Sequence, residues 1–130
     1  MIADTTFVVD LLRHNPDATR KLEELTNKGE PIVINAINIF EIFSGLSRSS
    51  KPKEEKEKIE NLLVNQVIIQ FEATHAEKAG EIDGLLIKEG KTIQPMDSMI
   101  AGICLVKNEK VLTRNSKDFS KIKNLKIETY

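Results

Sequence analysis

The chain has 130 residues, which is about the size of one domain and long enough to bury a core without disulfides. Its 19 basic and 20 acidic residues leave a net charge of −1, so it is not a basic nucleic-acid binder that relies on long-range attraction to phosphates. No apolar run approaches the roughly 18 to 20 residues of a membrane helix, and the first residues show no signal-peptide pattern. We therefore expect one cytoplasmic domain over residues 1–130 and no membrane partner.

The residue types limit the chemistry of any site. Cys104 is the single cysteine, so it cannot form an internal disulfide, and its apolar surroundings predict a buried, inert thiol. Cysteine-based zinc binding is excluded by count, and His14 and His75 lie far apart in the sequence. A bound metal would therefore take oxygen ligands, which favours magnesium, manganese or calcium.

Apolar spacing and helix-capping residues predict an alternation of strands and helices. A strand over 1–3 precedes a helix that carries Phe7, Val8, Leu11 and Leu12 at helical spacing. Asn15 caps a second helix, which Pro16 opens and which ends near Gly29. The later elements are a strand at 31–35, a helix at 37–46, a polar connection at 47–53, a helix at 54–63, a strand at 67–71, a helix at 74–89, an apolar helix at 95–106, a strand at 111–113, a loop or single helical turn at 115–121 and a strand at 125–129.

This alternation predicts an α/β fold with a parallel sheet flanked by helices in three layers. Ligands of such sheets bind outside the carboxyl ends of the strands. Acidic and polar residues gather at those predicted ends: Asp4 after the first strand, Glu41 two turns into the helix after the second, Asp97 in the first turn of the apolar helix, and Thr113, Asn115 and Asp118 at and after the strand at 111–113. In a parallel sheet these residues converge on one edge.

Each of these residues alone also has an ordinary structural explanation. Asp4 and Asp97 could cap helices, Asp118 could be a surface turn residue, and Glu41 a solvated helix residue. As a set, however, carboxylates at one edge repel each other, and a divalent cation removes that cost. Such an ion could activate water against a phosphodiester. Serine–histidine or cysteine–histidine chemistry is not credible, because both histidines lie away from the strand ends.

The candidates for phosphate contact are basic residues distributed along the chain, any of which could equally be a solvated surface residue. They are Arg13, Arg48, Lys51, Lys53, Arg114, Lys117 and Lys121.

Four segments resemble, in order, the motifs of PIN-domain toxins of the VapC type. They are IADTTFVVDLL (2–12), NIFEIFSGL (38–46), MDSMIAG (96–102) and LTRNSKDF (112–119). Each motif is loose alone, but four in order over the whole chain are specific. The resemblance implies a site for magnesium or manganese with Asp4, Glu41 and Asp97 as its acids, supported by Thr5 and Thr113, and endonucleolytic cleavage of RNA. It also implies a homodimer and a cognate antitoxin.

One position departs from the pattern of the family. Some relatives have an aspartate two residues after the threonine of the fourth motif, where this chain has Asn115. Asn115 can serve as a neutral ligand or hydrogen-bond partner, and Asp118 can supply the fourth charge through water.

The sequence therefore predicts a metal-dependent endoribonuclease, with Asp4 and Asp97 as metal ligands and Glu41 as ligand or water-orienting base. Arg13, Arg48 and Arg114 are the candidate phosphate contacts near these motifs. Two alternatives stay open. One is a non-catalytic PIN-like domain that binds RNA or protein. The other is a magnesium-dependent receiver or phosphohydrolase domain.

Overall fold

Five short parallel strands form the centre of the molecule. The structure is a computed structural model that describes residues 1–130, and its strands are β1 (Ile2–Ala3), β2 (Ile34–Asn35), β3 (Ile68–Ile69), β4 (Val111–Leu112) and β5 (Ile127–Glu128). β1, β4 and β5 pair in parallel, as do β2 and β3, and a parallel bridge between Ile2 and Val33 joins the two groups. The strand order is therefore β3-β2-β1-β4-β5. The predicted parallel sheet is confirmed, although each strand is shorter than the sequence suggested.

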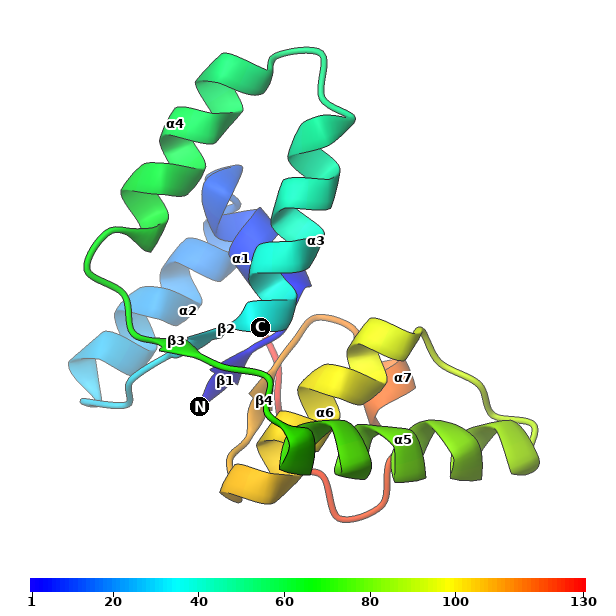
Figure 1. The fold of residues 1–130 in the computed structure, drawn as a ribbon. Helices are drawn as coiled ribbons and strands as arrows, with labels where there is room; N and C mark the ends of the chain where they lie inside the picture. The colour runs from blue at the N-terminus through cyan, green and yellow to red at the C-terminus, as the bar shows by residue number, and fades with distance from the viewer.

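Seven helices cover the sheet on both faces (Figure 1). Helices α1, α2, α3 and α4 lie on one side, and α5, α6 and α7 lie on the other, which gives the predicted three layers. Their bounds are α1 (Thr5–Leu12), α2 (Pro16–Asn27), α3 (Ala36–Ser47), α4 (Pro52–Leu63), α5 (Ala73–Lys88), α6 (Pro95–Lys107) and α7 (Ser116–Phe119). Asn15 caps α2 as predicted, accepting hydrogen bonds from the N–H groups of residues 17 and 18. None of the helices is long and apolar enough to cross a membrane.

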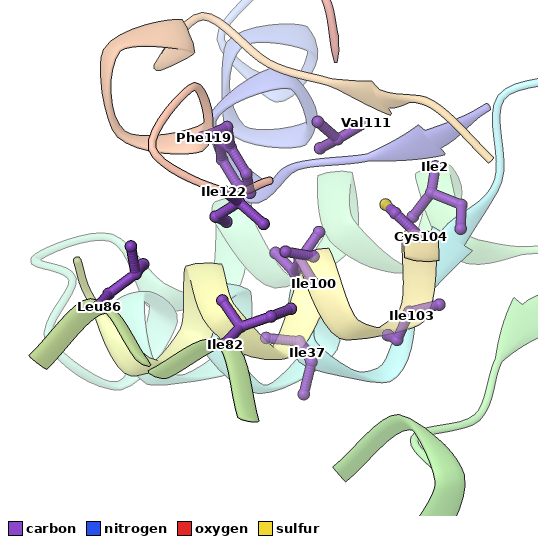
Figure 2. Close-up of a cluster of buried hydrophobic side chains, with 11 residues drawn as sticks. Ile2, Ile37, Ile82, Leu86, Ile100, Ile103, Cys104, Val111, Phe119 and Ile122 are labelled. Atoms are coloured by element: carbon purple, nitrogen blue, oxygen red, sulfur yellow. The ribbon is translucent and has the colours of Figure 1, made fainter. Parts of the chain in front are cut away.

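The alternation of side chains along β1 and β4 divides the core into two halves. Ile2 and Val111 point toward α5 and α6, whereas Ala3 and Leu112 belong to the cluster under α1, α2 and α4. Figure 2 shows the first half, in which Ile100 and Cys104 of α6 lie close to the strands. Cys104 is fully buried there, as predicted, and burial raises the pKa of its thiol to about 12.

Gly102 sets the close approach of α5 and α6. A Cβ atom at this position would lie 2.8 Å from the carbonyl oxygen of His75 and 2.9 Å from the backbone nitrogen of Ala79. A side chain would therefore push the two helices apart. This contact fixes the position of α6, whose first turn carries Asp97.

Helix α3 exposes two aromatic side chains. Phe40 is 62% exposed and Phe43 is 37% exposed, so neither side chain belongs to the buried core. The buried side of α3 carries Ile37, Asn38 and Ile42 instead. The apolar residues of α3 spread over more than one face, and the spacing alone did not show which face is covered.

Candidate active site

The order of the strands switches sides at β1. In chain order, β2 and β3 extend the sheet to one side of β1, and β4 and β5 extend it to the other. Such a switch point opens a crevice at the carboxyl ends of the strands. Asp4 follows β1, and Thr113 follows β4. The Thr113 hydroxyl donates a hydrogen bond of 2.6 Å to Oδ2 of Asp4. The two strand ends are thus joined directly at the crevice.

Asp4 is held in one orientation although it is only 2% exposed. Its Oδ1 accepts a hydrogen bond of 2.7 Å from the backbone N–H of Thr5, and its Oδ2 accepts one of 2.7 Å from the Thr6 hydroxyl. Asp4 is therefore the N-cap of α1 as well as a strand-end carboxylate. The capping role and the site role are compatible, because three hydrogen bonds still leave the carboxylate with acceptor capacity.

Glu41 of α3 reaches the same crevice through Thr5. The Thr5 hydroxyl donates to Oε1 of Glu41 at 2.7 Å and accepts a hydrogen bond of 3.0 Å from the Asn38 side chain. Asn38 thereby directs the Thr5 proton toward Glu41. Burial raises the pKa of Glu41, the hydrogen bond from Thr5 lowers it, and the charge of Asp4 raises it further.

Asp97 lies in the first turn of α6 and is half-buried. Its carboxylate forms no hydrogen bond or ion pair with another side chain, which distinguishes it from Asp4 and Glu41. Burial raises the pKa of Asp97 to about 7, and the negative charges of Asp4, Glu41 and Asp118 contribute to the rise. Asp4, Glu41 and Asp118 therefore lie within electrostatic range of Asp97. We call Asp4, Glu41, Asp97 and Asp118 together the acidic rim.

Asp118, the fourth acid, already has two partners within the protein. Lys121 forms an ion pair of 2.9 Å with its Oδ1, and the Asn115 side chain donates to its Oδ2 at 3.0 Å. These two contacts lower the pKa of Asp118, and Lys121 contributes the larger share. The backbone N–H of Asn115 also donates to the Thr113 hydroxyl at 2.8 Å. Asn115 thus links Asp118 to the strand end at Thr113.

The donor set of the acidic rim fits a divalent cation. Its members are hard carboxylate oxygens, and Asp97 has no positively charged protein partner. No three histidine, cysteine, aspartate or glutamate side chains lie close enough to hold a metal ion as they stand. A cation would therefore have to draw the carboxylates inward, with relief of their mutual repulsion as the driving force.

The three candidate phosphate-binding arginines lie in different environments. Arg114 follows the strand end and pairs through Nη1 with Oδ2 of Asp10 at 2.9 Å. Arg13 lines a cavity beside Glu41, and Arg48 is exposed at the end of α3. Arg13 and Arg48 are thus the C-cap residues of α1 and α3, whereas Arg114 has an acidic partner.

Four residues that support the site were missed by sequence reasoning. The side-chain amides of Asn35 and Asn38 both donate to the carbonyl oxygen of Ala3, at 3.0 and 3.2 Å, and fix the residue before Asp4. The Asn-x-x-Asn spacing of a capping box was the available signal. The other two residues are Thr6, which donates to Asp4, and buried Asp10, which pairs with Arg114 and accepts from the Tyr130 hydroxyl. They gave no comparable signal, because these contacts join residues distant in sequence or depend on side-chain rotamers.

Comparisons with known proteins identify the family of the chain. A family model described as the PIN domain matches residues 1–125. The chain is 31% identical over 127 residues to Ribonuclease VapC2 of Rickettsia felis, covering 98% of this chain and 95% of that protein. It is 24% identical over 127 residues to the tRNA(fMet)-specific endonuclease VapC of Shigella flexneri, with the same shares covered.

Solved structures give the same result. The structure of VapBC2 from Rickettsia felis bound to a promoter DNA fragment matches with a TM-score of 0.89 at 29% identity, over 99% of this chain and 97% of that chain. The DNA-bound VapBC of Salmonella typhimurium matches in fold with a TM-score of 0.87 at 23% identity, over 98% and 96% of the two chains.

PIN-domain nucleases generally use divalent metal ions, which agrees with the expected metal requirement. The alternative of a receiver or phosphohydrolase domain is excluded by the family match over nearly the whole chain. The chain belongs to the PIN domain family as a VapC-type ribonuclease, which confirms the family, the fold class and the endoribonuclease function that its four motifs predicted.

Proposed function

We propose that the acidic rim hydrolyses RNA phosphodiester bonds with the help of Mg²⁺ or Mn²⁺. The observation that carries this proposal is Asp97, a half-buried carboxylate that faces the charges of three other acids without a cationic partner. Such an arrangement costs folding stability unless a cation binds, and it is therefore typical of functional sites rather than of structural ion pairs.

Asp4 and Asp97 would hold the ion, and Thr113 would keep the Asp4 carboxylate oriented through its hydrogen bond. When bound, a divalent ion stabilises negative charge on the phosphate and lowers the pKa of a bound water. Oε1 of Glu41 is engaged by Thr5, so its Oε2 is available to orient a water molecule and to accept its proton. The water oxygen would then bond to phosphorus as the bond from phosphorus to a ribose oxygen breaks, and the departing ribose oxygen would take up a proton from solvent water.

Asn115 and Asp118 have supporting roles in this proposal. Because Lys121 and Asn115 occupy both oxygens of Asp118, this acid would act on the ion through water rather than as a direct ligand. Arg13, Arg48 and Arg114 would contact RNA phosphates on either side of the cut. Arg114 would do so with the guanidinium nitrogens that Asp10 leaves free.

We further propose that the chain is the toxin of a toxin–antitoxin pair, acts in the cytoplasm and forms a homodimer. Several solved structures that it resembles are VapBC complexes, and one is described as a toxin-antitoxin complex from Klebsiella pneumoniae. The exposed Phe40 and Phe43 on α3 supply an apolar surface that a partner protein would cover. Light scattering tests the dimer: the solution mass should be twice the 14.7 kDa of the chain, and a mass of one chain at all concentrations would contradict it.

The decisive test is cleavage of a mixed structured RNA by the wild type and by Asp97→Asn, each with Mg²⁺, Mn²⁺ or excess chelator. We expect the wild type to cut RNA only with metal. Asp97→Asn should keep its fold and cut at least about 100-fold more slowly. Full activity in a folded Asp97→Asn protein would overturn the assignment. A folded wild type that binds no metal and cuts no RNA would favour the non-catalytic alternative, for which the neutral Asn115 is the structural argument.

A further inference from the structure

Asp10 of α1 is a buried carboxylate that the proposed chemistry does not use. It is 5% exposed, and its Oδ2 has two partners, the Tyr130 hydroxyl, which donates at 2.8 Å, and Nη1 of Arg114, which forms an ion pair at 2.9 Å. A buried charge persists in a fold only where partners compensate it. The partners come from the segment after β4 and the segment after β5, so three distant parts of the chain meet here. We call Asp10, Arg114 and Tyr130 together the Asp10 cluster.

The Tyr130 ring is fixed by packing as well as by its hydroxyl. It lies edge-on against the ring of Phe7, with centroids 5.1 Å apart and planes at 76°. Phe7 is fully buried and lies one helical turn before Asp10 on α1. Burial and the hydrogen bond to Asp10 raise the pKa of Tyr130, so the phenol stays protonated and remains a donor. Tyr130 therefore orients the Asp10 carboxylate independently of Arg114.

The Asp10 cluster presents a cation, and not a carboxylate, to solvent. The side chain of Arg114 is 57% exposed, whereas that of Asp10 is 7% exposed. The guanidinium has about five N–H donors in a planar fork, and Asp10 pairs with Nη1, so most of the donors remain free. Asp10 offsets the long-range field of Arg114 but holds its fork in place. The arrangement therefore suits a short, directed contact with an anion, for which little side-chain freedom remains to be lost.

The backbone determines where this cation lies relative to the acidic rim. Arg114 directly follows Thr113, whose hydroxyl donates to Asp4. Asp10 lies six residues after Asp4, and the helical rise of roughly 1.5 Å per residue separates the two by about 9 Å along α1. This separation is larger than one phosphate group. The guanidinium would therefore meet a phosphate next to the one that the rim cuts.

We propose that Asp10 and Tyr130 are positioning residues that hold Arg114 as a preformed clamp for a backbone phosphate adjacent to the cut. This inference rests on the proposed function. Phosphate contacts are alike for every base, so the clamp sets the register of the RNA strand and not its sequence. Because the contact is made equally in the bound substrate and in the transition state, it acts on KM rather than on kcat. The competing interpretation is an ion pair that only joins α1 to the segment after β4.

The test compares RNA binding and cleavage in variants of the full chain. Binding of a fluorescent mixed structured RNA is followed by anisotropy in excess chelator, and KM and kcat are measured on the same RNA with Mg²⁺ or Mn²⁺. Tyr130→Phe keeps the ring against Phe7 and removes only the hydroxyl. It should weaken binding and raise KM about threefold, with little change in kcat. Arg114→Ala should weaken binding about tenfold.

A double variant shows whether Tyr130 acts through Arg114. Adding Tyr130→Phe to Arg114→Ala should weaken RNA binding no further, whereas two independent effects would multiply.

Asp10→Asn separates position from charge. Loss of a negative charge would strengthen RNA binding if charge alone mattered, but a mispositioned Arg114 should weaken it about threefold. Asp17→Asn is the matched control, because Asp17 also pairs with an arginine, Arg20, but on the exposed side of α2. It should leave RNA binding unchanged or slightly stronger.

The outcomes distinguish this proposal from the proposed function. RNA binding that depends on the Asp10 cluster, in a protein that never cuts RNA, would support the clamp and refute the nuclease mechanism. Cleavage by the wild type, with KM unchanged in Tyr130→Phe and Arg114→Ala, would overturn the clamp and leave the nuclease mechanism intact. A Tyr130→Phe effect that persists in full without Arg114, or a lower Tm with unchanged KM, would assign the cluster a structural role and also overturn the clamp. A folded wild type that neither binds nor cuts RNA would refute both.

Discussion

Replacing Asp97 by asparagine should stabilise the metal-free protein while it abolishes activity. The pKa of Asp97 is about 7 in the folded chain against an ordinary value of 3.8, so the folded state must give up a proton that it holds more tightly than the unfolded state does. The resulting loss in the free energy of unfolding is absent below about pH 4, grows as the pH rises toward 7 and is complete above 7. Asp97→Asn removes it.

The magnitude follows from the same difference in pKa. For a group fully shielded from water, the gap from 3.8 to about 7 would correspond to about 4 kcal/mol. Because Asp97 is only half-buried, solvent screening reduces this to about 1 to 2 kcal/mol. In chelator at pH 8 the variant should therefore melt about 3 to 10 °C above the wild type. At pH 4.5 the difference should nearly vanish.

The assay is thermal unfolding of both proteins in chelator at pH 4.5 and pH 8, repeated with saturating Mg²⁺ at pH 8. Metal should stabilise the wild type more than the variant, so the advantage of Asp97→Asn should shrink or reverse. Asp17→Asn is the matched control, because Asp17 also lies in the first turn of a helix but is exposed and paired with Arg20. An Asp97→Asn protein that gains no stability at pH 8, or gains equally at both pH values, would refute the reasoning.

Three further changes probe the contacts around the rim. Thr113→Val removes the donor to Asp4 and the acceptor of the Asn115 N–H. It should lower the free energy of unfolding, measured in urea, by about 1 to 3 kcal/mol and reduce cleavage. Thr113→Ser should retain most of the stability and most of the cleavage. Gly102→Ala forces a β-carbon against the backbone of α5 and should lower the free energy of unfolding by about 1 to 3 kcal/mol. Its control is Gly80→Ala, where a Cβ meets nothing within 4 Å, and this change should be neutral or stabilising. Equal effects of the two alanines would contradict the close helix contact. Lys121→Met removes the main cause of the low pKa of Asp118, so an NMR titration should show that pKa rising toward its ordinary value. No rise would mean that the ion pair is not formed in solution.

The acids of the rim were predictable because strand ends are visible in sequence. Asp4 directly follows an apolar strand and Asp97 lies in the first turn of an apolar helix, so the rule for parallel sheets places them together without any knowledge of side-chain packing. The bounds of the helices were also close, since proline and asparagine mark their starts. Helix α4 was predicted to begin at residue 54 and begins two residues earlier, at Pro52, because proline suits the first helical position.

Other features depended on packing that no local pattern encodes. The exposure of Phe40 follows from which face of α3 meets the sheet, and that face is chosen partly by the polar Asn38, which bonds the carbonyl of Ala3. The ion pair of Asp118 with Lys121 requires one particular pair of rotamers. The cavity that Arg13 lines beside Glu41 exists only where α1, α3 and α4 meet. Spacing predicted which residues approach the site, but not how each is partnered there.

The central claim is that the acidic rim is the metal site, and a Mn²⁺ titration followed by NMR tests it most directly. Because Mn²⁺ broadens nearby resonances, the amides of Thr5, Ser98 and Asn115, each next to or bonded to the rim, should disappear first at substoichiometric metal. Asp97→Asn should require much more Mn²⁺ for the same loss. Early broadening along α4 or α5, with these three amides unaffected, would contradict the account.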